Sequence, residues 1–276
     1  MTINCKGQLI DLSVPKVMGI LNVTPNSFFD GGKYTNESKM LTQVEKILED
    51  GATFIDIGAY SSKPKSEFVS EELELLRIVP MVNSILAHFP ETLISIDTFR
   101  ANVAKVCIEN GATMINDISA GLGDEKMLDT IAKYNIPYVM MHMRGTPLTM
   151  QSLTSYENII KELLYYFSER IAQARIYGIN DLIIDPGFGF AKTLEQNYEV
   201  LQKLELFKIL DLPLLVGFSR KSMIYKPLNS SSEQALNGTT VLNTIALTKG
   251  VKILRVHDVK EAVECVTLFN KCSING

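Results

Sequence analysis

The feature that most limits how this chain can fold is a regular alternation of short apolar runs with longer amphipathic segments. The short runs are hydrophobic at nearly every position, which is typical of strands buried on both faces of a parallel sheet. We expect strands at 16–21, 53–57, 92–96, 113–115, 137–141, 181–184, 214–216 and 252–256. We expect the helices between and after them at 37–50, 70–88, 100–110, 124–134, 155–177, 194–206, 233–249 and 257–269.

Local signals mark the ends of several of these helices. Ser70 is followed by two glutamates, a combination that favours an N-cap and a first helical turn. Gly51, Gly111 and Gly178 follow three of the expected helices, as glycine does just beyond a helix C-terminus. Eight strand–helix units in 276 residues fit a (β/α)8 barrel, or TIM barrel, better than an open doubly wound sheet. The first dozen residues are expected to form a short hairpin at the bottom of the barrel, and residues 1–276 to form a single domain.

Composition excludes several classes of function. The chain has 27 Lys and Arg against 31 Asp and Glu, a net charge of −4, and no basic run, which argues against nucleic acid as a partner. No apolar stretch approaches the ~18 residues of a membrane span, and the polar N-terminus does not resemble a signal peptide. The four cysteines are scattered without a C-x-x-C pair, as in reduced proteins. We therefore expect a cytoplasmic protein.

In a barrel of this kind, chemistry is expected where the strands end and their following loops begin. Carboxylates and amides end several short apolar strands, where an unpartnered charge is costly. Asp97, Asn116 and Asp185 suit a ligand with several N–H donors and an amide edge, such as a heterocycle. A carboxylate cluster that binds a metal is the competing interpretation, because hard cations also prefer oxygen ligands. Other polar or glycine positions at strand ends are Asn22, Asp56, Gly58, Asp117, His142, Ser219, Arg220, Lys221, Arg255 and His257.

A second group at the strand ends is cationic. Lys221, Arg255 and His257 together suit a phosphate or pyrophosphate, which arginine can bind in a bidentate manner. His142 is either a packed strand-end histidine or a catalytic group, and the sequence leaves both open. The chain has no G-x-G-x-x-G, Walker A or G-x-S-x-G motif, so nothing indicates a dinucleotide, P-loop or serine-hydrolase site.

Seven motifs in order give the chain a family resemblance. They are VMGILNVTPNSF at 17–28, SIDT at 95–98, INDI at 115–118, MHM at 141–143 with GTP at 145–147, DPGFGFAK at 185–192, GFSRKS at 217–222 and RVHDV at 255–259. In this order and spacing they resemble the dihydropteroate synthases from about residue 17 to the end. The resemblance implies a TIM barrel that joins 6-hydroxymethyl-7,8-dihydropterin pyrophosphate to p-aminobenzoate. The products are 7,8-dihydropteroate and pyrophosphate, in folate synthesis.

The resemblance also implies roles for individual residues. Asp97, Asn116, Asp185 and Lys221 would hold the pterin, with Arg255 stacked against it. The pyrophosphate would be received by Asn22, Arg255 and His257, with Asn22 also near Mg²⁺ and Ser62 offering a hydroxyl to the phosphate. The p-aminobenzoate side would consist of Pro64, Phe190, Ser219, Lys221 and Ser222. Asp97, Asp185, Lys221 and Arg255 are the expected catalytic residues, and a homodimer through the late helices is implied.

Two loops depart from the family pattern. The second loop usually reads G-G-E-S-T-R-P, whereas residues 58–64 are GAYSSKP, with Tyr60 in place of the glutamate and Lys63 in place of the arginine. In the first loop Asn26 replaces the aspartate of T-P-D-S. Two other functions remain as alternatives. A methyltransferase that passes a methyl group from methyltetrahydrofolate to a corrinoid would have no pyrophosphate to hold. A non-catalytic pterin-binding protein would not be expected to keep Asn22, Lys221 and Arg255.

Overall fold

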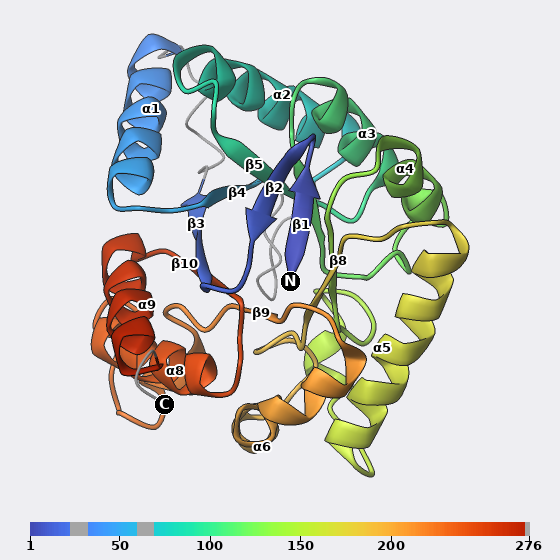
Figure 1. Ribbon diagram of the computed structural model, residues 1–276, viewed down its shortest axis with the longest axis vertical. Helices are drawn as coiled ribbons and strands as arrows, with labels where there is room; N and C mark the ends of the chain where they lie inside the picture. The colour runs from blue at the N-terminus through green and yellow to red at the C-terminus, as the bar shows by residue number, and fades with distance from the viewer. Residues whose placement is uncertain (23–32, 60–68, 274–276) are drawn as a thin grey trace.

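The computed structural model describes residues 1–22, 33–59 and 69–273, and it forms a barrel of parallel strands surrounded by helices (Figure 1). The strands lie in the order β8-β7-β6-β5-β4-β3-β10-β9. A parallel bridge between Ile184 and Leu214 joins the two ends of this order and closes the barrel. The barrel strands are β3 (Lys16–Asn22), β4 (Phe54–Gly58), β5 (Leu93–Asp97), β6 (Met114–Asp117), β7 (Tyr138–Met141), β8 (Leu182–Asp185), β9 (Leu215–Val216) and β10 (Ile253–Val256).

The helices form the outer layer and return the chain from each strand to the next. Ser70 caps α2, accepting a hydrogen bond from the Leu73 amide, as the sequence predicted. Three short elements were not predicted: the 3-10 turns at Met150–Ser152 and Leu204–Leu210, and the four-residue helix at Ser222–Tyr225. The helices are α1 (Lys33–Glu49), α2 (Glu71–His88), α3 (Ala101–Glu109), α4 (Met127–Tyr134), α5 (Ile159–Ile176), α6 (Leu194–Gln202), α7 (Ser222–Tyr225), α8 (Leu236–Thr248) and α9 (Val259–Ser273), with 3-10 turns at Met150–Ser152 and Leu204–Leu210.

The inside of the barrel has its own small core, separate from the larger one between strands and helices. Each of the eight barrel strands contributes one buried side chain to it: Met18, Phe54, Leu93, Met114, Val139, Ile183, Leu215 and Ile253. Ile3, Cys5, Ile10 and Leu12 of the hairpin β1 (Thr2–Cys5) and β2 (Gln8–Asp11) pack against this layer. The hairpin lies across one end of the barrel in Figure 1. It therefore closes the bottom, as predicted, and leaves the other end for polar groups.

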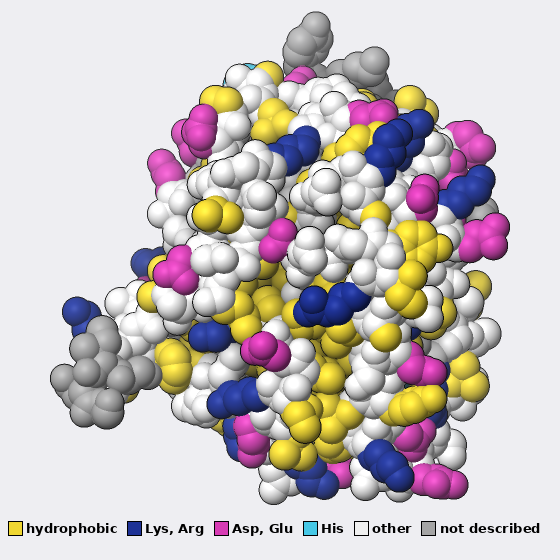
Figure 2. Space-filling model, turned by 45° about the vertical axis from the view of Figure 1, so that its right-hand side comes forward, with side chains coloured by type: hydrophobic (Ala, Val, Ile, Leu, Met, Phe, Trp, Pro, Cys, Tyr) yellow, Lys and Arg dark blue, Asp and Glu magenta, His cyan; other side chains and the backbone are white. Residues whose placement is uncertain are grey.

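The eight-unit barrel and its N-terminal hairpin are thus confirmed, with element bounds shifted by only a few residues in most cases. No helix in the described part of the chain is long and apolar enough to span a bilayer. On the face shown in Figure 2, basic and acidic side chains are interspersed rather than gathered by sign.

Candidate active site

The alternation of side chains along each strand explains why one end of the barrel, its mouth, is polar. Side chains alternate between the two faces of a strand, so the residues two positions after the inner apolar layer also face inward. These residues are Ile20, Asp56, Ser95, Asn116, Met141, Asp185, Gly217 and Arg255. Asp97, two residues after Ser95, is the last residue of β5. The carboxylates and the arginine predicted from widely separated motifs therefore meet at one end of the barrel.

Asp56 is at the centre of this layer and accepts three hydrogen bonds. Ser95 Oγ donates to its Oδ1 over 2.6 Å, and Asn116 Nδ2 donates to its Oδ2 over 3.2 Å. Arg255 Nε donates to the same Oδ2 over 2.6 Å. The Asp56 side chain is 0% exposed, so its charge is balanced by Arg255 and not by water. Asp56 thus fixes the orientation of two predicted ligand-binding residues.

Arg255 connects Asp56 to Asp97 at the more open part of the mouth. Its Nη2 donates to Asp97 Oδ2 over 2.8 Å, and 16% of the Asp97 side chain remains exposed. Burial raises the pKa of Asp97 to about 7, against the opposing effect of the Arg255 guanidinium. Burial disfavours the charge on Arg255 itself, but Asp56 and Asp97 outweigh this and raise its pKa. Arg255 therefore stays cationic beside a carboxylate that titrates near neutrality.

Asp185 and Lys221 form the other side of the mouth. Asp185 Oδ1 accepts from the Gly187 amide over 2.8 Å, and burial raises its pKa against the influence of Lys221. Lys221 Nζ donates to Phe188 O over 2.6 Å and lies 5.0 Å from the centre of the Phe190 ring. Burial lowers the pKa of Lys221 to about 8, with Asp185 opposing the shift. A cation and an aromatic face are thus held together at this edge.

His257, Ser219 and Ser222 lie where β9 and β10 end. Ser219 Oγ accepts from the His257 amide over 3.1 Å and lies 3.0 Å from His257 Nδ1, which ties the two strand ends together. The His257 side chain is exposed, whereas Ser219 is buried. Ser222 begins the short α7 immediately after Lys221. Arg220, which the sequence placed among the strand-end residues, pairs with Asp258 over 3.0 and 2.7 Å.

At two strand ends, the structure corrects one prediction and decides between the alternatives left open for another. Asp117 does not face the mouth, because it follows the inward-facing Asn116 and alternation turns it outward. It accepts from Tyr138 Oη over 2.6 Å and from two residues of its own loop. His142 is 3% exposed, and its ring packs edge-on against Tyr166 with centroids 4.8 Å apart. Burial lowers the pKa of His142 to about 2, which favours the packed interpretation over an acid–base role.

Several predicted residues lie outside what the structure describes. These are Ser62 and Pro64 of the site, together with Asn26, Tyr60 and Lys63 of the departing loops. Asn22 is the last residue of β3, paired in register with Gly58, but its side chain also falls outside the described part.

The described residues do not form a metal site. Among them there is no group of three or more His, Cys, Asp or Glu side chains placed to hold an ion. The carboxylates that a cation would need, Asp56 and Asp97, are bound to Arg255. Of the carboxylates in the carboxylate-cluster interpretation, Asp97 is therefore held in an ion pair and Asp185 accepts from the Gly187 amide. The described donor set does not fit a resident Mg²⁺.

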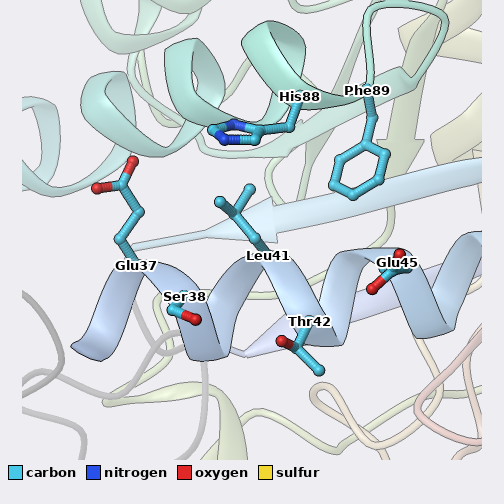
Figure 3. Close-up of a pocket in the computed structure, with 7 residues that line it drawn as sticks. All are labelled: Glu37, Ser38, Leu41, Thr42, Glu45, His88 and Phe89. Atoms are coloured by element: carbon cyan, nitrogen blue, oxygen red, sulfur yellow. The ribbon is translucent and has the colours of Figure 1, made fainter. Parts of the chain in front are cut away.

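A separate hollow lies on the outside of the barrel, between α1 and the end of α2 (Figure 3). Glu37, Leu41 and Glu45 line it from α1, and His88 and Phe89 face them from the other side. Glu37 Oε1 accepts from Ser84 Oγ over 2.5 Å, which fastens the two helices together. The hollow shares no lining residue with the mouth, within the described residues, so the two are distinct features.

Known proteins carry the same sequence pattern and the same fold. The family model described as "Pterin binding enzyme" matches residues 18–257. The chain is 43% identical over 261 residues to a dihydropteroate synthase of Haemophilus influenzae, covering 94% of each chain. The chain belongs to the dihydropteroate synthase family of pterin-binding enzymes.

Solved structures of this family superpose closely on the chain. A Yersinia pestis dihydropteroate synthase in complex with a sulfonamide drug matches it with a TM-score of 0.92 and 40% identity, over 100% of both chains. A Xanthomonas albilineans dihydropteroate synthase with 4-aminobenzoic acid matches with a TM-score of 0.90 and 34% identity, over 99% of this chain and 98% of that one. The family resemblance read from the seven motifs is therefore confirmed.

Sequence reasoning about this dihydropteroate synthase family member left two buried residues without a role. Asp56 was noted only as a strand-end residue, and Lys192 only as the last letter of a motif. The one available signal was a charged residue next to strongly apolar neighbours, in FIDI at 54–57 for Asp56. Their partners are far away in sequence, so no local pattern could identify them.

Proposed function

We propose that this chain joins 6-hydroxymethyl-7,8-dihydropterin pyrophosphate to p-aminobenzoate, forming 7,8-dihydropteroate and pyrophosphate. The observation that carries the proposal is the mouth itself. It combines the oxygen acceptors of the buried Asn116 and Asp185 and of the partly exposed Asp97 with the cations Arg255 and Lys221. The first group matches the N–H donors and amide edge of a pterin, and the second matches an anionic leaving group. Family membership supplies the reaction class, a transferase.

The chemistry needs charge stabilisation more than proton transfer. The pyrophosphate leaves from a carbon attached to an electron-rich dihydropterin, so the bond breaks early and positive charge develops in the ring. Asp97 and Asp185 would stabilise that charge, while Arg255 and His257 would stabilise the departing anion. The p-aminobenzoate nitrogen is unprotonated near neutral pH and attacks without a strong base. Binding both substrates in line would supply much of the acceleration.

We propose that the second substrate binds at the edge of the mouth formed by Phe190 and Lys221. Phe190 is half-buried, and its ring lies 5.0 Å from Lys221 Nζ. An aromatic face beside an ammonium suits a benzoate, whose ring can stack and whose charge is negative. Ser219 and Ser222 flank Lys221, and Pro64 is proposed to complete this side. Ser62 and Asn22 are proposed to contact the phosphates.

Mg²⁺ is proposed to arrive with the pyrophosphate, because the described donors do not form a site for it. Magnesium is commonly held through substrate phosphates and only one or two protein groups, which fits Asn22 as a lone contact. Binding of Mg²⁺ to the free protein is expected to be undetectable by calorimetry. Tight binding of Mg²⁺ without the pyrophosphate would contradict this.

The decisive experiment mixes the purified protein with Mg²⁺, the pterin pyrophosphate and p-aminobenzoate. Pyrophosphate release that depends on p-aminobenzoate is expected, with dihydropteroate formed in equal amount. A sulfonamide should inhibit, and saturating p-aminobenzoate should relieve the inhibition. Pterin binding without turnover would instead support a non-catalytic pterin-binding protein. Methyl transfer from methyltetrahydrofolate to a corrinoid would support the methyltransferase alternative. No covalent pterin–protein adduct is expected during turnover.

We also propose a homodimer formed through the late helices, in the cytoplasm. Val241 and Ile245 of α8 and Leu268 of α9 are exposed, and α8 and α9 lie side by side in Figure 1. Burying these apolar side chains against a second copy would be favourable. Light scattering during gel filtration should give twice the mass of 30.8 kDa. A monomeric mass at high protein concentration would rule the dimer out.

A further inference from the structure

Lys192 is a lysine buried inside the protein, behind the segment that follows Asp185, where burial lowers its pKa to about 7 and Asp185 opposes the shift. Its side chain is 5% exposed. Lys192 Nζ lies 3.0 Å from Gly187 O, 3.1 Å from Phe190 O and 3.1 Å from His142 Nδ1. An ammonium group has three hydrogens and no lone pair, so these three acceptors match it fully. The match requires His142 to be neutral with its proton on Nε2.

The two carbonyls bound by Lys192 are the ends of a tight turn. The Phe190 amide donates to Gly187 O over 3.1 Å, and the Gly189 amide donates to Asn197 Oδ1 over 2.7 Å. Gly187 has a φ of +72°, and a Cβ there would lie 2.1 Å from His142 O. The turn therefore packs directly on the strand end that carries His142. Its geometry depends on contacts from behind as well as on its own hydrogen bonds.

This turn places Phe190, whereas the pterin-side residues are held in other ways. Asp97, Asn116 and Asp185 are the last or near-last residues of barrel strands, fixed by sheet pairing. Phe188 is buried, with its ring 4.5 Å from that of Phe218. Phe190 lies beyond these anchors. Losing the Lys192 bonds would therefore loosen Phe190 first.

A buried lysine is a costly way to fill space. Removing an ammonium from water is unfavourable, and a methionine would occupy a similar volume without that penalty. A methionine could not donate a hydrogen bond to either carbonyl or to His142. The feature that lysine adds at position 192 is directional bonding to the turn.

We propose that Lys192 is a positioning residue that holds the Gly187–Phe190 turn in the conformation that receives p-aminobenzoate. It touches neither substrate in this assignment and acts through Phe190. The identity of the substrate rests on the proposed function, whereas the ordering of the turn does not.

The test compares Lys192→Met with Lys203→Met, the same change at a lysine on the adjoining segment. The Lys203 side chain is 46% exposed, and within the described residues it pairs only with Glu199. Steady-state pyrophosphate release is measured with each substrate varied in turn. Lys192→Met should raise the KM for p-aminobenzoate by about tenfold or more, corresponding to about 1.4 kcal/mol of lost binding. The KM for the pterin pyrophosphate should stay within about twofold. Lys203→Met should change neither.

His142→Phe provides a second variant that keeps the ring contact with Tyr166. It leaves the ammonium two of its three acceptors, so a smaller rise of about two- to threefold in the KM for p-aminobenzoate is expected. This variant keeps the proposal testable if Lys192→Met does not fold. Amide hydrogen exchange of the peptide covering 185–192 should accelerate in both variants, without any substrate present.

The outcomes separate the inference from the proposed function. Wild-type protein without p-aminobenzoate-dependent release would overturn the proposed function, and the exchange rates would still decide whether Lys192 orders the turn. An active wild type whose Lys192→Met variant keeps its p-aminobenzoate KM and its exchange rates would overturn the inference alone. Equal rises in both KM values would also overturn it, because they would indicate a general disturbance of the mouth.

Discussion

Removing the carboxylate of Asp56 should destabilise the whole barrel, although the residue lies in the layer that forms the site. Asp56→Ala deletes the acceptor for Ser95 Oγ, Asn116 Nδ2 and Arg255 Nε. It leaves the Arg255 guanidinium with Asp97 as its remaining ion-pair partner among the described residues. The variant then retains a largely buried cation that has lost one of the two carboxylates that balance its charge.

The size of the loss follows from the burial of the pair. Removing one partner of a buried ion pair costs about 3–5 kcal/mol. Because 21% of Arg255 is exposed, water can compensate part of the charge, and about 3–4 kcal/mol of unfolding free energy is the expected loss. An unfolding entropy of roughly 2.1 cal/mol/K per residue gives about 0.6 kcal/mol/K for this chain, so Tm should fall by about 5–7 °C.

Asp97→Ala is the matched control, since it removes the other carboxylate bound to Arg255. Asp97 is partly exposed, and its raised pKa means that folding does not stabilise its charge. It should lose about 1 kcal/mol or less while losing pterin binding. Urea titrations followed by circular dichroism measure both variants, and calorimetry measures pterin binding. The reasoning fails if Asp56→Ala is as stable as wild type, or if Asp97→Ala loses as much stability.

Three further changes test other parts of the mouth. Burial raises the pKa of Asp97 from 3.8 to about 7, so the folded state binds a proton that the unfolded state has released between these two values. Wild type should therefore lose stability relative to Asp97→Asn as the pH rises from about 4 to about 7, with no further change above that, which urea titrations at each pH would measure. A Cβ on Gly217 would lie 3.6 Å from Arg255 O and 3.8 Å from Arg255 Cβ, so there is room for one methyl group. Calorimetry should therefore show a pterin affinity within about threefold of wild type for Gly217→Ala. Gly217→Val should bind pterin about 100-fold more weakly, because its methyl groups would extend into the mouth. Gly187→Ala should lose about 3 kcal/mol in urea titrations, because it combines a positive φ with a Cβ 2.1 Å from His142 O; wild-type stability would show that the turn can shift.

Most of the fold could be predicted because its signals are local. Apolar runs, helix caps such as Ser70 and the terminating glycines each depend on a few neighbouring residues. The exceptions depended on packing. The chain after α6 continues as a 3-10 helix at Leu204–Leu210, where Leu204 and Phe207 are buried, although the sequence favoured a longer α-helix.

The sequence predicted which residues form the site, but not which hydrogen bonds and ion pairs connect them. Asp97, Asn116, Asp185, Lys221 and Arg255 were all expected at strand ends, and the described structure gathers them at one end of the barrel. Their partners were not expected. Arg255 is 199 residues from Asp56 along the chain, and Lys192 is 50 residues from His142.

By itself the sequence determined the eight strand–helix units, the hairpin, the polar strand ends and the family, because each depends on residue types at fixed short spacings. Only the tertiary structure decided which of two adjacent polar residues faces inward, as with Asn116 and Asp117. It also decided that Asp56 and Arg255 form a buried pair and that Lys192 lies behind the Gly187–Phe190 turn. The physical reason is barrel closure. The register of each strand against its neighbours sets which side chains share a level, and that register is a property of the whole sheet rather than of any single strand.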